Sequence, residues 1–286
     1  MKKLLVPALL VIIILSSCGE ETPTPTPSPS SKKISEIYYE FEKHDYISND
    51  NGQTWNEYQS DYEEKELRER WTWDGDKILS IENYSELIYD NVSYNIYYNE
   101  ENLVSEIIAP DIDERVIFTY NNNQISSMDF YFEDNLSTTW DLVYTNNKIT
   151  QIYSSNIQSN DNIPYITITW NGNNISKLKY RDNYDEGELL YTYDNKRNPY
   201  HDSDALLALS LVKEGEVALA LMSANNITSY TIQMDGILEE THNFTYQYQN
   251  NYPTLKTERE ENVHTDPEYM TKHISERRYY IDYLED

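Results

Sequence analysis

The stretch Phe118-Thr119-Tyr120-Asn121-Asn122-Asn123-Gln124-Ile125 contains the unit that decides the fold. Its two aromatic residues are two positions apart, so in an extended strand they lie on the same face of a sheet. The asparagines that follow tolerate the positive φ angles that tight hairpin turns require. An apolar residue then opens the next segment, five positions after the second aromatic. The stretch therefore predicts a β-hairpin.

The same unit recurs along the chain. Further copies lie at 71–78, 142–149, 168–175 and 191–198, with looser copies at 98–103 and 246–253. The second aromatic returns every 22 to 26 residues, which is the length of two strands and two turns. We expect a mainly β fold: a long antiparallel up-and-down meander that is curled or partly closed, because long sheets twist. A propeller is disfavoured, since one blade needs about 40 residues or more.

A second apolar residue often follows the first by three positions, as in Ile125 and Met128 or Ile149 and Ile152. Strict alternation would place such a pair on opposite faces of the sheet. Two explanations stay open at this point. Either a β-bulge turns both side chains to one face, or both faces of the sheet are partly covered.

One long interruption breaks the repeat. About 55 residues separate Tyr193 from the next aromatic repeat. Asp202, Ser203 and Asp204 are residue types that cap helix N-termini, and mostly apolar residues follow. We expect one short helical insertion near 203–222, packed on the sheet or closing one end of it. A membrane span is disfavoured because polar residues interrupt a stretch already at the minimum length.

The amino end has the order of a secretory signal: two lysines, an apolar run and small residues. About a dozen apolar residues are too few for a permanent membrane span. The residues Leu15-Ser16-Ser17-Cys18 resemble the lipobox of bacterial lipoproteins, in which the cysteine is lipidated and the signal is removed before it. We therefore expect a signal peptide at 1–17, lipidated Cys18 with a Pro/Thr/Ser-rich linker at 18–33, and a single repeat-built β domain at 34–286.

The resemblance also implies a location. Acyl chains on Cys18 would hold the protein in the lipid bilayer of the cell envelope, at the outer membrane, on its periplasmic face or on the cell surface. The acidic pair after Gly19 resembles an export tag for surface lipoproteins. Alternating prolines in the linker favour an extended polyproline II spacer. Cys18 is the only cysteine, so an internal disulfide is excluded.

Composition narrows the class of partner. The formal net charge is −28, and such an acidic surface repels phosphate backbones, so we expect no nucleic-acid partner. The chain has 28 tyrosines and only 5 phenylalanines. Most of these rings should fill the core, although each buried hydroxyl then needs a hydrogen-bond partner.

One further resemblance concerns the repeat itself. The segment Tyr191-Thr192-Tyr193-Asp194-Asn195-Lys196-Arg197-Asn198-Pro199-Tyr200 looks like a tyrosine–aspartate (YD) repeat. Together with the lipobox, the hairpins and Asn225-Asn226-Ile227, it is similar to a family of uncharacterised bacterial lipoproteins, known as a domain of unknown function. That resemblance implies a fold and an anchor, but no activity.

The residue pattern indicates no catalytic site, no metal site and no cofactor. The five histidines lack zinc-site spacing, and His201-Asp202-Ser203-Asp204 is read as a helix start rather than a triad. Two acidic loops, 182–188 and 73–76, are candidate calcium sites, but they lack the full EF-hand pattern and are read as solvated turns.

Three functions remain open. The leading hypothesis is a non-enzymatic envelope lipoprotein that binds a glycan or protein ligand. The alternative is a structural or scaffolding lipoprotein. The third is a carboxylate-based glycoside hydrolase, which needs two carboxylates facing each other at roughly 5–10 Å.

Overall fold

The computed structural model describes residues 32–286, apart from 51, 85–90, 157–162, 182–185, 202–207, 209–218, 235, 266–269 and 285–286. Lys32–Asp286 forms one compact unit. The signal peptide, Cys18 and most of the linker lie outside the described residues. The expectations about lipidation therefore stay predictions.

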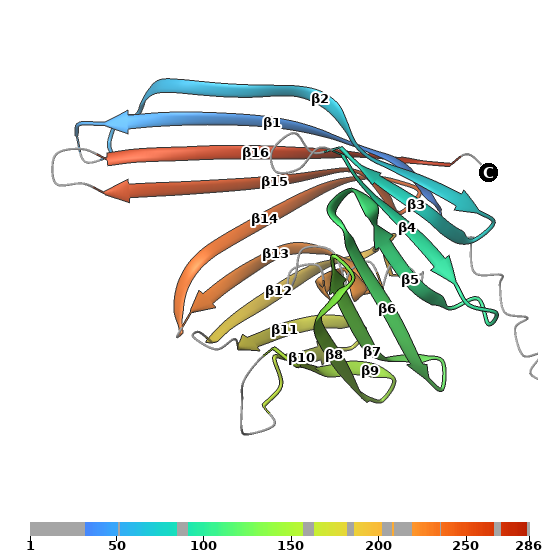
Figure 1. Ribbon diagram of the computed structural model, residues 1–286. Helices are drawn as coiled ribbons and strands as arrows, with labels where there is room; N and C mark the ends of the chain where they lie inside the picture. The colour runs from blue at the N-terminus through green and yellow to red at the C-terminus, as the bar shows by residue number, and fades with distance from the viewer. Residues whose placement is uncertain are drawn as a thin grey trace, which may run out of the picture. The chain divides into compact units, whose positions relative to one another are not determined.

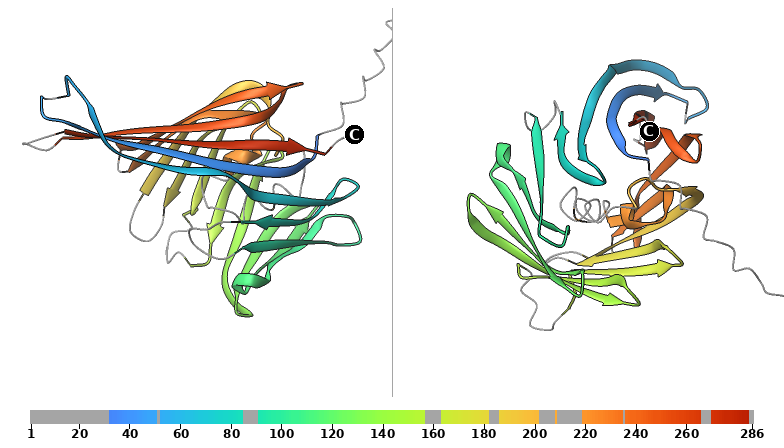
Figure 2. Two further views of the ribbon diagram at one scale, coloured as in Figure 1. Left: turned by 90° about the horizontal axis from the view of Figure 1, so that it is seen from above. Right: turned by 90° about the vertical axis from the view of Figure 1, so that its right-hand side faces the viewer.

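In the described part of the chain, sixteen strands form a closed antiparallel barrel in which each strand pairs with the next one along the chain (Figure 1). Figure 2 shows the strands following one another around a ring. The strands are β1 (Ile34–Ser48), β2 (Asn56–Asp74), β3 (Lys77–Asn83), β4 (Val92–Tyr98), β5 (Val104–Ala109), β6 (Glu114–Asn121), β7 (Gln124–Phe132), β8 (Asn135–Thr145), β9 (Lys148–Ser154), β10 (Ile166–Asn171), β11 (Asn174–Arg181), β12 (Glu186–Arg197), β13 (Asn225–Met234), β14 (Ile237–Gln249), β15 (Tyr252–Thr265) and β16 (Met270–Tyr283). The short 3-10 helix η1 (Pro110–Ile112) joins β5 to β6.

The barrel closes where the last strand meets the first. β16 pairs with β1 along nearly its whole length, from Ile34 opposite Tyr283 to Ser48 opposite Met270. The predicted up-and-down meander is confirmed, but the expectation of a sheet that is only curled or partly closed is wrong. Accumulated twist over sixteen strands brings the two end strands together, and their pairing removes both sheet edges along this seam.

The hairpin turns have the backbone that the repeat predicts. Asn122 and Asn123 both have positive φ, at 50° and 62°, and Asn146 and Asn147 repeat this pattern at 52° and 61°. Positive φ at both central residues is the geometry of a type I′ turn, whose twist matches that of the flanking strands. The asparagines are therefore selected by backbone conformation.

A bulge after each of these turns explains the spacing of three. Thr119 is opposite Ser127 and Tyr120 is opposite Ile125, so Ser126 has no opposing residue. The extra residue turns Ile125 and Met128 to the same face, where both are buried. Of the two explanations left open by the sequence, the bulge is confirmed. The same register shift occurs between β2 and β3, β8 and β9, β10 and β11, and β14 and β15.

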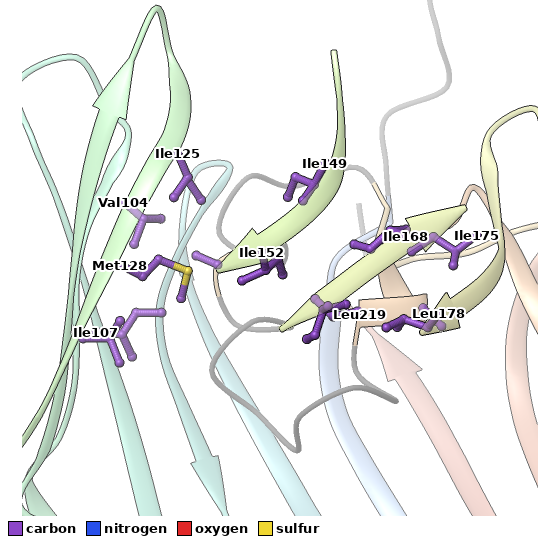
Figure 3. Packing of buried hydrophobic residues seen from close by; sticks show 14 of the residues in the cluster. Val104, Ile107, Ile125, Met128, Ile149, Ile152, Ile168, Ile175, Leu178 and Leu219 are labelled. Carbon is purple, nitrogen blue, oxygen red and sulfur yellow. The ribbon is translucent and has the colours of Figure 1, made fainter. Parts of the chain in front are cut away.

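These repeated pairs build the core. Figure 3 shows Ile125 and Met128, Ile149 and Ile152, and Ile175 and Leu178 projecting into a shared interior from successive hairpins. Buried side chains from most of the strands join the same cluster, together with Leu219 and Ala220 from the segment before β13. Burial of each such side chain contributes about 1.5–3 kcal/mol, so the barrel interior is a packed core.

Several inward aromatic residues, among them the second aromatic of four repeats, have a separate task at the turn end of the barrel. The ladder between β3 and β4 reaches only Ser80 opposite Asn95, so Ile78 lies beyond it. The Tyr98 hydroxyl donates to the Ile78 carbonyl at 3.0 Å and bridges this gap. An inward aromatic therefore satisfies a backbone acceptor that the ladder leaves open.

At least six side chains of the described residues make this bond, and we call these six the aromatic latches. They are Trp73 to Ile34, Tyr98 to Ile78, Tyr120 to Val104, Trp170 to Ile149, Tyr246 to Ile227 and Tyr283 to Pro253, each donating to a backbone carbonyl at 2.7–3.0 Å. In every case the carbonyl lies past the end of its ladder. The hydroxyl partners that buried tyrosines require are thus supplied by the main chain.

Most of the expected helical insertion near 203–222 lies outside the described residues, so no complete helix is seen there. Of its described residues, Ala208 and Leu219 have helical backbone, and Ala220–Met222 form the 3-10 helix η2. Buried Asn198 donates to the Leu221 and Ser223 carbonyls, both at 2.8 Å. These bonds join the end of β12 to the return of the chain into β13.

The outer face of the barrel is mainly polar, with single exposed apolar side chains such as Leu79, Val143 and Leu190. On β11, Lys177, Lys179 and Arg181 alternate with inward residues, and they lie across from Glu188 and Glu186 on β12. Lys179 and Glu186 are 2.9 Å apart, and Lys177 and Glu188 are 3.3 Å apart. Threonine and serine occupy many other outward positions, such as Thr167 and Thr169 on β10, Thr231 and Ser229 on β13, and Thr241 and Thr245 on β14.

Candidate functional site

Four strands run past the rest of the barrel wall. Pairing of β14 with β15 ends at Asn243 opposite Arg259, and pairing of β2 with β3 ends at Glu69 opposite Asn83. Beyond these points β2, β1, β16 and β15 continue as a four-stranded sheet, which Figure 1 shows extending past the other strands while β14 bends away. We call residues 38–48, 56–67, 260–265 and 270–275 the projecting sheet.

The two faces of the projecting sheet follow from its register. Ile37 and Ile281 are opposite each other and buried in the core, so the residues that alternate with them along β1 continue the inner face. Tyr39 and Phe41 lie on this inner face. Tyr38, which pairs with Tyr280, lies on the outer face.

A charged cluster lies on the inner face at the base of this sheet. His242 on β14 contacts Glu258 on β15, with Nδ1 and Oε1 2.8 Å apart, and Glu240 through Nε2 at 3.0 Å. Arg277 on β16 lies 3.8 Å from Glu258 and 3.5 Å from Glu260. The Tyr230 ring stacks on His242 with centroids 4.4 Å apart. We call His242, Glu258 and Arg277 the base cluster.

Two members of the base cluster, His242 and Glu258, are nearly closed to solvent, whereas the Arg277 side chain is 32% exposed. Glu258 is only 8% exposed. Burial would raise its pKa, but the hydrogen bond with His242 and the charges of Lys256 and Arg277 outweigh burial, so the pKa of Glu258 is lowered. The hydrogen bond with Glu258 raises the pKa of His242, burial opposes it, and Glu240 adds to the rise. Each member therefore favours the charged form of the others.

This arrangement does not match what glycoside hydrolysis requires. The imidazole of His242 fills the space between the Glu240 and Glu258 carboxylates and binds both. A glycosidase instead leaves that space for the sugar and holds one carboxylic acid with a raised pKa. The lowered pKa of Glu258 is the opposite of a general acid. The base cluster instead holds β14, β15 and β16 together through these charged contacts.

The outer face of the projecting sheet combines tyrosines with carboxylates. Glu40 accepts hydrogen bonds from Tyr62 at 2.6 Å and Tyr280 at 2.5 Å. These two bonds, the one from Tyr280 being the stronger, lower the pKa of Glu40. The Lys65 ammonium lies over the rings of Tyr280 and Tyr38, 4.1 and 4.7 Å from their centroids. Phenol hydroxyls thus face acids while ring faces hold cations.

Near the outer end of the projecting sheet, a second lysine also lies over aromatic rings. The Lys272 ammonium lies 4.9 Å from the Trp55 ring and 5.1 Å from the Tyr46 ring. On the inner face, buried Asp45 contacts Lys43 at 3.1 Å and His273 at 2.6 Å. The projecting sheet therefore presents aromatic rings held by neighbouring cations, together with acidic and basic side chains that contact one another.

The candidates taken from the sequence are not brought together. His201 binds the Met222 carbonyl through Nδ1 at 2.8 Å, which is a structural contact, and 202–207 lie outside the described residues. In the turn 73–76, Lys33 contacts the Gly75 carbonyl at 2.7 Å and Asp76 at 2.8 Å, so a lysine balances this acidic turn. Residues 182–185 of the other acidic loop are outside the described part.

Across the described residues, no group of three or more His, Cys, Asp or Glu side chains has the geometry to hold a metal ion. Sequence reasoning missed the base cluster because three separate strands supply it. The only local signal is Glu240-x-His242, whose alternation places both side chains on one face. Nothing local connects that pair to Glu258 or Arg277.

In the part of the chain that the structure describes, no helix has the length and apolarity needed to cross a bilayer. No family model matches the sequence, and no curated protein matches it. Among solved structures, the chain is similar to a porin-like protein from Bacteroides uniformis, with a TM-score of 0.51 and 13% identity over 89% of this chain and 100% of that one. A weaker match is the ywiB protein from Bacillus subtilis, with a TM-score of 0.14, 9% identity and coverage of 86% and 93%. At such identities the first likeness concerns the fold alone, and the second carries no argument.

Proposed function

We propose that this protein is a non-catalytic binding module of the cell envelope and that the projecting sheet is its ligand surface. The observation that carries the proposal is the sheet itself. Four strands continue past the wall with neither outer edge covered by another described strand. A purely structural barrel needs no such extension, because closure and core packing are complete without it.

The polar outer wall supports a water-facing barrel rather than a pore through lipid. Transmembrane barrels carry an outward apolar band and a polar interior. Here Ile152, Ile166 and Leu178 are inside, while Lys177 and Lys179 point outward. Charged side chains in contact with the bilayer midplane would each cost about 2–4 kcal/mol. The barrel therefore has an apolar interior and a polar exterior, which is the reverse of the arrangement in a transmembrane barrel.

Lipid attachment then supplies the link to the membrane. The lipobox-like residues that end at Cys18 favour an anchor in the outer membrane, on its periplasmic face or at the cell surface. The proline-rich segment acts as a spacer of roughly 3.1 Å per residue. An acidic barrel that repels anionic headgroups suits such tethering.

The test removes the outer part of the projecting sheet and leaves the barrel. One variant replaces 43–61 and 261–274 with Asn-Gly turns after the Glu42–Tyr62 and Glu260–Ser275 pairs. Biotin-labelled intact and shortened chains are compared on a glycan array and in capture from envelope extracts, with circular dichroism to confirm that both are folded. We expect the intact chain to retain a ligand that the folded shortened chain loses. Equal capture by both chains, or no capture by either, refutes the proposal; the latter favours a scaffolding role.

A further inference from the structure

The N-terminal half of β2 is a free strand edge. Its residues 56–66 are all exposed, and among the described strands β1 is the one that pairs with them. In an antiparallel pair, every second residue directs its N–H and C=O groups away from the partner strand. Bulges at Tyr58 and at 64–65 interrupt this alternation, so the longest regular run is 59–63, about 17 Å at roughly 3.3 Å per residue. An edge of this length can accept an added strand.

The charge of this edge selects the chemistry of that strand. Acidic side chains dominate it: Glu57, Asp61, Glu63, Glu64 and Glu66, against the single basic residue Lys65 within 56–66. Paired with the same edge of a second copy, it would face like charges, which is destabilising. The other free edge, on β15, carries Glu260 and Glu261 and repels it too. A basic strand is the complementary partner.

Two exposed rings point to the same chemistry. Tyr58 and Tyr62 on this edge are 55% and 58% exposed. Elsewhere on the sheet, aromatic rings already hold cations: Lys65 over Tyr38 and Tyr280, and Lys272 over Trp55. The hydroxyl of Tyr62 donates to Glu40, which fixes its ring at the edge. A lysine or arginine on an added strand would meet a ring of this kind beside a carboxylate.

We propose that the β2 edge of the projecting sheet binds an extended, lysine- or arginine-rich segment of a partner protein as an additional strand. The inference rests on the proposed function, since it names the partner for that surface. Main-chain hydrogen bonds supply affinity, and the alternate cationic side chains, which share one face, meet Asp61 and Glu63 on the inner face or Tyr62 on the outer face, according to register. An alternative explanation is that the acidic residues serve only to prevent aggregation through this edge. If that were their sole role, no added strand would bind.

The probe is a ten-residue peptide that alternates lysine and threonine, titrated by fluorescence anisotropy against the mature chain with Cys18→Ser. A lysine–proline peptide of equal length and charge is the matched control, because proline has no N–H and cannot join a ladder. We expect the lysine–threonine peptide to bind at least tenfold more tightly than the control. Hydrogen exchange should slow in 56–66, and affinity should fall as salt is added.

Two double variants separate the edge from overall charge. Asp61→Lys/Glu64→Lys should weaken peptide binding roughly tenfold, as expected for the loss of a few surface charge contacts. Glu100→Lys/Glu101→Lys makes the same charge change in an exposed turn and should alter binding by less than about twofold. Tyr58→Ser should weaken binding several-fold.

Three results would overturn the inference: equal affinity for both peptides, equal weakening by both double variants, or a dimer through β2 in sedimentation. Each leaves the capture experiment on the projecting sheet unaffected. If the intact chain captures an envelope ligand through the sheet and still ignores the lysine–threonine peptide, the proposed function stands and the partner chemistry is wrong.

Discussion

The aromatic latches make a prediction that two neighbouring residues can test. Tyr98→Phe keeps the ring but removes the hydroxyl that donates to the Ile78 carbonyl. Tyr97→Phe removes the hydroxyl of the adjacent residue, which lies on the other face of the strand and is 48% exposed. Both variants lose one oxygen atom from β4, so they differ mainly in whether a latch is lost.

The size of the effect follows from the position of the bond. A buried intramolecular hydrogen bond contributes about 1 kcal/mol, and a carbonyl left without a donor adds to the cost. We therefore expect Tyr98→Phe to lower the free energy of unfolding by about 1–2 kcal/mol. Unfolding entropy of about 2.1 cal/mol/K per residue over roughly 250 residues gives about 0.5 kcal/mol/K, so Tm should fall by about 2–4 °C.

The assay is urea unfolding followed by tryptophan fluorescence, together with calorimetry. Tyr97→Phe should stay within about 0.5 kcal/mol of the parent chain. Tyr120→Phe, another latch, should behave like Tyr98→Phe, and the two losses should add if each latch acts on its own ladder gap. Equal stability of Tyr97→Phe and Tyr98→Phe would show that the carbonyls are satisfied without the latches, and the reasoning would fail.

Four further predictions concern the pH response, the turns and the anchor. The pKa of His242 is raised in the fold, so its stabilisation is complete below about pH 6.5 and is lost as pH rises through the folded value; His242→Gln should flatten the fall of Tm on that side, whereas an unchanged slope would exclude the base cluster as its source. The pKa of Glu258 is lowered, so its contribution is present above about pH 4.5 and is lost on acidification; Glu258→Gln should reduce acid sensitivity in the same melts. Asn123→Val forces a β-branched residue to a φ of 62° and should cost about 1–2 kcal/mol in urea unfolding, while Asn123→Gly should be neutral or stabilising. Cys18→Ala should abolish palmitate labelling and move the protein out of the membrane fraction, yet leave it folded without detergent; continued labelling, or a need for detergent, would contradict the anchor or the water-facing wall.

The hairpins could be predicted because their determinants are local. Asn122 and Asn123 encode positive φ, Tyr120 marks the bulge, and the spacing of Ile125 from Met128 requires one. Each of these signals acts within about ten residues, so a single repeat suffices to read it. The latches are also visible in outline, because a surplus of tyrosine implies hydroxyls that need partners.

Closure and the candidate surface could not be predicted in this way. The pairing of Ile34 with Tyr283 depends on the twist summed over all the intervening strands, and no single hairpin specifies that sum. His242, Glu258 and Arg277 meet only after closure and are separated in the sequence. The free edge of β2 is likewise defined by which strands end early, a property of their neighbours rather than of β2.

The pairing of β1 with β16 also sets an order of events for the chain. During synthesis or export β1 emerges first, and its closing partner emerges last. Until then the nascent sheet has two open ends, and the interior side chains of every hairpin face water. Folding to the closed state is consequently a late step governed by a contact of very high sequence separation, which slows folding. The net negative charge of the chain opposes association between incompletely folded copies before the barrel closes.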